Sequence, residues 1–232
     1  MKSAEQQSIV MLHRTRDLLV RQRTMLVNAL RGHLGEFGVI GVKGISRLPD
    51  LLTTATSSPV CELPDLAREC IEMLLVQIQD LQRRVSMVEH TITEWHRRSE
   101  ISRRLETIPG VGVISASAIA ALVPDAGNFR SARQFAAWIG LVPRLSGTGG
   151  KVKLGGISKA GDRYLRRLLT LGATSLVRYA RHSPQKWTWI AALLARRPTR
   201  VVITAVANKI ARIVWAVLSH GDSFRRPQAA AA

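Results

Sequence analysis

The sequence predicts an all-α protein: a long coiled-coil helical arm, followed by a compact helical domain with a helix-hairpin-helix and a glycine-rich loop. Two long segments carry apolar residues at helical spacing, which predicts long amphipathic helices. Glycine and proline cluster between these segments, which predicts a connector. The basic residues gather in the second half of the chain, which distinguishes the domain from the arm.

Composition limits the class of partner. The chain has 232 residues, 46% of them hydrophobic, which is enough for one large or two small folded domains. Lys and Arg number 34 against 16 Asp and Glu, a net charge of +18. Residues 105–232 carry 19 of the basic residues and four acids, a net charge of +15. Such an excess favours a nucleic acid over the alternative polyanion, an anionic membrane surface.

The sequence also predicts the compartment. Cys61 and Cys70 lack metal-ligand spacing and indicate no disulfide framework, which favours a reducing cytoplasm. The apolar run from Val111 to Val123 is too short to span a bilayer, and no signal peptide opens the chain. We therefore expect a soluble cytoplasmic protein with no membrane partner. The histidines contain no i, i+4 pair, so no metal site is predicted.

The arm is expected over residues 1–104, with a connector rich in glycine and proline at 35–63. A first helix is predicted from Ser3 to Leu34, with an apolar stripe of Leu12, Leu18, Leu19, Met25, Leu26 and Leu30. A second helix from Pro64 carries apolar residues at alternating steps of three and four: Ile71, Leu74, Ile78, Leu81, Val85, Val88, Ile92 and Trp95. Such a seam is typical of a coiled coil. It can close within the chain or between chains, and we expect a homo-oligomer.

The basic domain is expected over residues 105–222, followed by a loose tail at 223–232. It opens on Ile108-Pro109-Gly110-Val111-Gly112, the signature of a helix-hairpin-helix turn, whose glycine amides can face a phosphate. The alternative is a tight turn between packed helices. Further helices are predicted after Phe129, over Asp162–Arg181 and over Thr199–Leu218. The tryptophans from Trp187 to Trp189 are better core anchors than base-stacking residues.

The central stretch of the domain runs from Pro143 to Leu169, as a glycine-rich loop that leads into a helix. Glycine amides, lysines and a helix N-terminus together suit a phosphate. The glycine spacings of nucleotide-binding loops are absent, so we predict a site for a nucleic-acid backbone. The predicted nucleic-acid-binding residues are Gly110, Gly112, Arg144, Gly149, Gly150, Lys151, Lys153, Lys159, Arg163, Arg166 and Arg167.

The candidate chemistry follows from the scarcity of acids in this half. Metal-dependent phosphodiester cleavage needs clustered carboxylates, whereas its four acids are scattered. A hydroxyl group remains: Ser146 or Thr148 can attack phosphorus while lysine and arginine stabilise the developing charge. The alternative is a hydroxyl that only hydrogen-bonds its own backbone.

Four runs of residues, in this order, resemble the IS110 family of insertion-sequence transposases, in its IS1111 branch. They are IPGVG, FRSARQFAAWIGLVPR, GGKVKLGGISKAGDRYLRRLL and VANKIARIVWAVL. The opening run KSAEQQSIVMLHRTRDLLVRQRTMLVNALRGHLGEFG resembles the helix that follows the family's N-terminal domain. The likeness therefore covers almost the whole chain.

The resemblance implies a DNA recombinase that is guided by a structured RNA. The family combines an N-terminal RuvC-like domain, whose carboxylates bind magnesium, with a C-terminal domain whose loop serine links covalently to DNA. This chain resembles only the part after the RuvC-like domain, so we expect no cofactor in it and no recombination by it alone. The family pattern Pro-Arg-x-x-Ser-Ser/Thr-Gly-Gly-Lys places its hydroxyls at Gly147 and Thr148. Ser146 lies one position earlier and is our candidate nucleophile, with Thr148 in reserve.

The predicted function is thus the DNA-binding C-terminal part of an RNA-guided transposase that cleaves and joins DNA strands through a loop serine when complete. One alternative is a non-catalytic nucleic-acid-binding or dimerising remnant of such an enzyme. Another is a helix-hairpin-helix accessory protein of DNA repair. A denaturation-resistant DNA adduct favours the enzyme, a salt-sensitive complex alone favours the remnant, and structure-selective binding without RNA favours the accessory protein.

Overall fold

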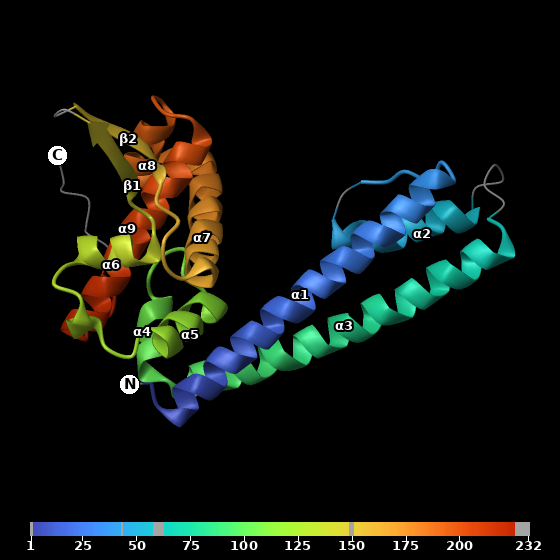
Figure 1. The fold of residues 1–232 in the computed structure, drawn as a ribbon, viewed down its shortest axis with the longest axis horizontal. Coiled ribbons are helices and arrows are strands. Elements are labelled where there is room, and N and C mark those ends of the chain that lie inside the picture. Colours follow the sequence, from blue (N-terminus) through green and yellow to red (C-terminus); the bar gives the residue numbers. More distant parts are fainter. Residues whose placement is uncertain (1, 43, 58–62, 149–150, 226–232) are drawn as a thin grey trace. The chain divides into compact units, whose positions relative to one another are not determined.

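The computed structural model describes residues 2–42, 44–57, 63–148 and 151–225. The fold is mostly helical, as predicted, with one small two-stranded sheet among the described residues (Figure 1). The chain divides into two compact units. We call residues Met11–Thr91 the arm unit, and Met1–Val10 together with Ile92–Ala232 the core unit. The predicted domain limits at residues 104 and 222 stay predictions.

The arm unit is built on two long antiparallel helices, α1 (Ala4–Glu36) and α3 (Asp65–Arg98). The Arg16 guanidinium lies 2.6 Å from a Glu89 carboxylate oxygen, and Arg23 donates to Gln82. The partners are seven residues apart in opposite directions along the two helices, which fixes the antiparallel order. Between the helices, η1 (Ile45–Arg47) and α2 (Leu48–Ser57) fall inside the predicted connector.

The predicted seam of α3 is the buried side of that helix. Ile71, Ile78, Val85 and Ile92 are all buried, and Ile71 and Ile78 pack in one cluster with residues of α1 such as Leu30. Burial of these side chains stabilises the pair of helices, because each removes apolar surface from water. Whether the pair forms a true coiled coil stays a prediction.

The apolar stripe of α1 differs in part from the one predicted, because Leu30 is buried and Leu26 packs beside it, whereas other predicted members face outward. Leu18 and Met25 are 48% and 68% exposed. The buried side instead contains His13, which is 1% exposed. Burial, aided by the neighbouring Arg16, lowers the pKa of His13 from 6.5 to about 4. Sequence periodicity assigned the stripe to leucine and methionine and missed a neutral histidine that packs as a core residue.

The core unit contains the remaining helices around one hydrophobic core. They are α4 (Glu100–Glu106), α5 (Val113–Leu122), η2 (Ala126–Asn128), α6 (Ala132–Ile139), α7 (Arg163–His182), η3 (Pro184–Trp187), α8 (Thr188–Leu194) and α9 (Thr199–His220). Phe135, Leu165 and Val214 are fully buried in this core. Residues that repeat every three or four positions on α7 and α9 supply most of it, as expected for amphipathic helices.

Helix α9 is also long and apolar enough to cross a membrane, the single such helix among the described residues. Its inner side, including Val202, Val206 and Ile210, packs in the core of this unit. Core packing accounts for that composition, and a helix that meets only the length and composition criteria is weak support for a membrane span.

The stretch predicted as a glycine-rich loop in an all-α domain is instead an antiparallel β-hairpin. Its strands are β1 (Pro143–Thr148) and β2 (Lys151–Ile157). The physical cause is visible in the sequence, because Lys151, Val152, Lys153 and Leu154 alternate charged and apolar residues with the two-residue period of a strand. The glycine content predicted a phosphate-binding loop, and this alternation was missed.

Candidate nucleic-acid interface

The candidate nucleophile Ser146 lies on the exposed part of strand β1. Ser146 and Lys153 are directly paired across the hairpin, so their side chains project from the same side of it. Arg144 precedes Ser146 by two residues on the same strand, where the register of the two strands shifts between Pro143 and Leu145. A hydroxyl group and a lysine are thus brought together on one side of the hairpin, and Arg144 lies close to them along β1.

The other lysine of the hairpin and the reserve nucleophile lie nearer its end. Lys151 is exposed, and its backbone pairs with that of Thr148. Gly149 and Gly150, predicted to contact phosphate, lie outside the described residues.

The base of the hairpin is held by close backbone contacts. Gly140, with φ of +82°, ends α6, and Gly161, with φ of +73°, precedes α7. A Cβ on Gly161 would lie 1.8 Å from the Trp138 carbonyl oxygen, so only glycine fits there. Arg166 donates to the carbonyl oxygens of Ile139 at 2.8 Å and Ala160 at 2.7 Å. These contacts fix where β1 begins and where β2 returns to α7.

Arg166 therefore has a positioning role in the structure, and its predicted contact with nucleic acid stays a prediction. The neighbouring arginines of α7 differ from it. Arg163 is exposed in the first turn, and the Arg167 guanidinium lies over the Tyr164 ring at 5.2 Å. The helix itself is capped by Asp162, whose carboxylate accepts from the Leu165 amide at 2.8 Å.

The Ile108–Gly112 turn lies apart from the hairpin. Gly110 has φ of +84° and packs against α7, where a Cβ on Gly172 would come within 1.9 Å of the Gly110 carbonyl oxygen. This close packing matches the alternative interpretation, a tight turn between helices. Gly112 is exposed at the start of α5, with open space beside its Cα.

A large groove runs between the base of the hairpin and α9, with a volume of about 1360 Å³. Its walls include Gly155 and Gly156 of β2, Trp189 of α8, and Asn208 of α9. Asn208 donates to the Leu141 carbonyl oxygen at 3.1 Å, which ties α9 to the residues just before β1. Small glycines on one wall and an anchored helix on the other keep the groove open.

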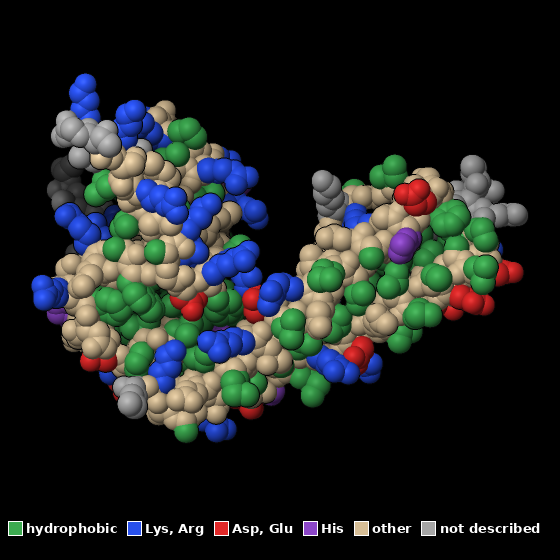
Figure 2. All heavy atoms as spheres, in the orientation of Figure 1, with side chains coloured by type: hydrophobic (Ala, Val, Ile, Leu, Met, Phe, Trp, Pro, Cys, Tyr) green, Lys and Arg blue, Asp and Glu red, His purple; other side chains and the backbone are tan. Residues whose placement is uncertain are grey.

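Five cations line this groove, and we call them the groove cations: Arg144, Lys159, Arg200, Lys209 and Arg212. All five are exposed, and none of their side chains forms a hydrogen bond or ion pair with a residue that the structure describes. Within the described part of the chain, no Asp or Glu lines the groove. Lys and Arg also outnumber acids on the side of the core unit shown in Figure 2. Unpaired cations around a concave surface attract a polyanion.

Three of the four acids of the basic half interact elsewhere. Glu106 binds His96, Asp125 caps η2, and Asp162 caps α7. No group of three or more His, Cys, Asp or Glu among residues 2–42, 44–57, 63–148 and 151–225 could hold a metal ion. The described residues of the hairpin and groove offer cations and hydroxyls, and no carboxylates, to a phosphodiester.

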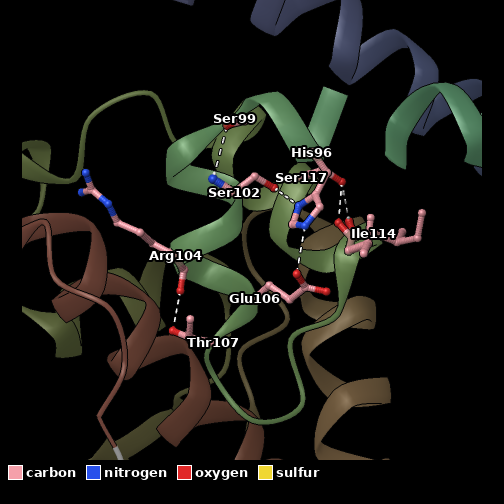
Figure 3. Close-up of polar contacts among 9 residues, drawn as sticks. His96, Ser99, Ser102, Arg104, Glu106, Thr107, Ile114 and Ser117 are labelled. Atoms are coloured by element: carbon pink, nitrogen blue, oxygen red, sulfur yellow. Dashed lines mark hydrogen bonds and ion pairs between the residues drawn. The ribbon is translucent and has the colours of Figure 1, made fainter. Parts of the chain in front are cut away.

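A serine, a histidine and a glutamate also meet at the junction of α3 and α4 (Figure 3). The Ser102 hydroxyl lies 2.7 Å from His96 Nδ1, and Glu106 Oε2 lies 2.9 Å from His96 Nε2. The order resembles that of a hydrolytic triad. Ser102 is fully buried, however, and His96 is only 4% exposed, so no substrate reaches the hydroxyl. The cluster fixes the angle between the two helices by hydrogen bonding.

Sequence reasoning identified part of this interface. It named Arg144 and Lys159, which line the groove, but not Arg200, Lys209 or Arg212, which line it from α9. Their polar spacing along an amphipathic helix was visible, but nothing local showed that α9 packs beside the hairpin.

Three curated relatives place these features in a family. The chain is 46% identical to the "Probable family 20 transposase" of Pseudomonas aeruginosa, over 97% of the chain and 67% of the relative. It is 37% identical to the "Transposase for insertion sequence element IS1328" of Yersinia enterocolitica, over 97% of the chain and 67% of the relative. It is 35% identical to the "Transposase for insertion sequence element IS1111A" of Coxiella burnetii, over 97% of the chain and 62% of the relative.

The chain spans about three fifths to two thirds of the length of the curated relatives it matches. The model of the "Transposase IS116/IS110/IS902 family" matches residues 102–188, which include the Ile108–Gly112 turn, the described parts of the hairpin and all of α7. The chain therefore belongs to the IS110/IS116/IS902 family of transposases.

Proposed function

We propose that the core unit binds DNA and, in the complete protein, cleaves and joins DNA strands through Ser146. The observation that carries this proposal is the position of the Ser146 hydroxyl. It is exposed, directly opposite Lys153, and two residues along β1 from the groove cation Arg144. A serine in an irregular loop that bonds its own backbone would support neither attack on a phosphate nor charge stabilisation beside it.

The proposed step conserves atoms and charge. The Ser146 oxygen forms a bond to phosphorus, one bridging P–O bond of the DNA backbone breaks, and the leaving oxygen takes up a proton as the serine loses one. A DNA hydroxyl then attacks the phosphoserine ester, which restores the serine and joins the strands. Lys153 and Arg144 stabilise the negative charge that develops on the phosphoryl oxygens.

Further properties of the complete protein are proposed from its membership of the family. Guidance by a structured RNA, and magnesium held by the carboxylates of a RuvC-like domain, are proposed for the whole protein and not for these residues. Cytoplasmic location is proposed on the same basis. Homo-oligomerisation is supported by the exposed side of α1, where Met11, Leu18 and Met25 recur every seven residues at 48% exposure or more. An apolar stripe of this kind suits a second helix.

The test is covalent trapping. The complete protein is incubated with end-labelled DNA, denatured, and analysed for a protein–DNA band. We expect Ser146→Ala to abolish the band, with more than 100-fold loss, while DNA affinity changes less than twofold. Thr148→Ala is the matched control and should retain the band. A band that persists in Ser146→Ala and disappears in Thr148→Ala would assign the nucleophile to Thr148.

A non-catalytic remnant is the second candidate, favoured by Gly147 at the position where the family pattern has a serine. Neighbouring residues on a strand project to opposite sides, so a hydroxyl at 147 would lie on the side of the hairpin opposite Lys153. The exchange Ser146→Gly with Gly147→Ser separates the two candidates. Trapping by the exchanged protein, without trapping by the original, would identify this chain as the remnant.

A further inference from the structure

The groove contains features that phosphate binding alone does not require. Trp189 lines it and is 40% exposed, although tryptophan in a small helical core is usually buried. The Lys209 ammonium lies 4.0 Å from the centre of the Trp189 ring. This cation–π contact holds a charge and an aromatic surface next to each other. Val201 and Ile213 add apolar surface to the same groove.

This combination suits unpaired nucleotides. Proteins that bind single strands align cations along the backbone and offer aromatic rings on which bases stack. In a duplex the bases are already stacked on one another, so an exposed tryptophan would gain little. The volume of about 1360 Å³ also exceeds the roughly 300–1,000 Å³ of small-molecule sites, which favours a polymer.

The groove continues toward the proposed nucleophile. Arg144 lines the groove, and Ser146 lies two residues further along β1. A strand bound in the groove would therefore pass from the α9 cations to the Ser146–Lys153 pair. The occupant is a DNA strand and not an RNA, because the serine beside it acts on DNA in the function proposed above.

We propose that the groove between α8, α9 and the hairpin base binds a single-stranded DNA segment, with a base stacked on Trp189 and phosphates on the groove cations. This inference rests on the proposed function for its choice of DNA. It adds a binding site of α8 and α9 that the hairpin alone does not provide.

The experiment measures the affinity of the protein for fluorescent oligo(dT), oligo(rU) and a matched duplex at one fixed salt concentration. We expect tightest binding to oligo(dT). Trp189→Ala should weaken it about tenfold or more, since a stacked base contributes roughly 1–3 kcal/mol. Trp189→Phe should restore most of the affinity. Lys209→Ala should weaken binding severalfold.

The matched controls are Tyr179→Ala and Arg178→Ala, an exposed aromatic and an exposed cation of α7 outside the groove, and both should stay within twofold. Photocrosslinking of a 5-iododeoxyuridine oligonucleotide gives a second readout that needs no variant, with Trp189 expected as the crosslinked residue. Preference for duplex or for oligo(rU), unchanged affinity in Trp189→Ala, or crosslinks confined to residues outside the groove would each overturn the proposal. Absence of covalent trapping by the complete protein with Ser146 unchanged, together with intact oligo(dT) binding, would contradict the role of Ser146 and leave the groove assignment standing.

Discussion

The arginines of the arm unit and the cations of the core-unit groove occupy different environments. In the arm unit, Arg16 pairs with Glu89 and Arg23 with Gln82, and Arg31 donates to the Gly41 carbonyl oxygen at 2.9 Å. The groove cations have no such partners among the described residues. The position of a basic residue therefore matters more for ligand binding than the number of basic residues. Paired arginines hold helices together, whereas unpaired ones remain available to a ligand.

The first test concerns the anchor of the hairpin and has the largest expected effect. Gly161→Ala places a Cβ against the Trp138 carbonyl oxygen at a φ that side chains rarely adopt. We expect the free energy of unfolding to fall by about 4 kcal/mol, from backbone strain and displaced packing together. Urea denaturation measures it. Gly156→Ala, where nothing lies within 4 Å, is the control and should change stability by less than about 1 kcal/mol. Equal effects would show that the hairpin base is loosely held.

The second test concerns the arm unit, where burial keeps His13 neutral. Its pKa is about 4 in the folded protein and 6.5 in the unfolded chain. Below pH 6.5, His13 of the unfolded chain binds a proton, whereas His13 of the folded protein binds one only near pH 4. The free energy of unfolding should therefore be greatest above pH 6.5 and decline by about 3 kcal/mol as the pH falls to 4.

The comparison that isolates this residue is His13→Gln, which should flatten the decline over pH 6.5 to 4. His33→Gln, at an exposed position of the same helix, should leave it intact. An unchanged pH profile in His13→Gln would mean that His13 is protonated or accessible in the folded protein.

The third test replaces one arginine in each of the two regions and has the smallest expected effect on stability. Arg16→Met removes a partly buried ion pair and should cost about 1 kcal/mol of stability, with DNA affinity unchanged. Arg212→Met removes an unpaired groove cation, so stability should stay constant while affinity for oligo(dT) falls severalfold. Thermal unfolding and fluorescence anisotropy on both variants provide the measurements. The opposite pattern would refute the distinction between paired and unpaired cations.

Local sequence signals predicted most of the helices and missed the features that long-range packing creates. Helices α7 and α9 follow from their apolar periodicity, and the buried seam of α3 from its spacing. The groove depends on contacts such as that of Asn208 with Leu141, which join positions 67 residues apart. Arg166 illustrates the same limit, because its charge suggested a phosphate ligand while its position gave it two carbonyl oxygens.

The candidate nucleophile shows what strand register adds to a motif. In an irregular loop, a serine one position early could shift to the required place. In a hairpin its pairing with Lys153 fixes its side, and a shift of one residue would reverse that side. The strand register therefore determines the side of the hairpin on which residue 146 lies, which residue spacing alone could not determine.

The most direct measurement of the central claim is the salt dependence of DNA binding. We compare the triple variant Arg200→Ala/Lys209→Ala/Arg212→Ala with a triple variant of ion-paired arm residues, Arg16→Ala/Arg21→Ala/Arg47→Ala. Each phosphate contact on a single strand contributes about 0.7 to the slope of log K against log salt. We predict that the groove variant lowers the magnitude of the slope by about 2, and that the arm variant leaves it unchanged. Equal slopes for the groove variant and the original protein, or an equal loss in both variants, would contradict the claim.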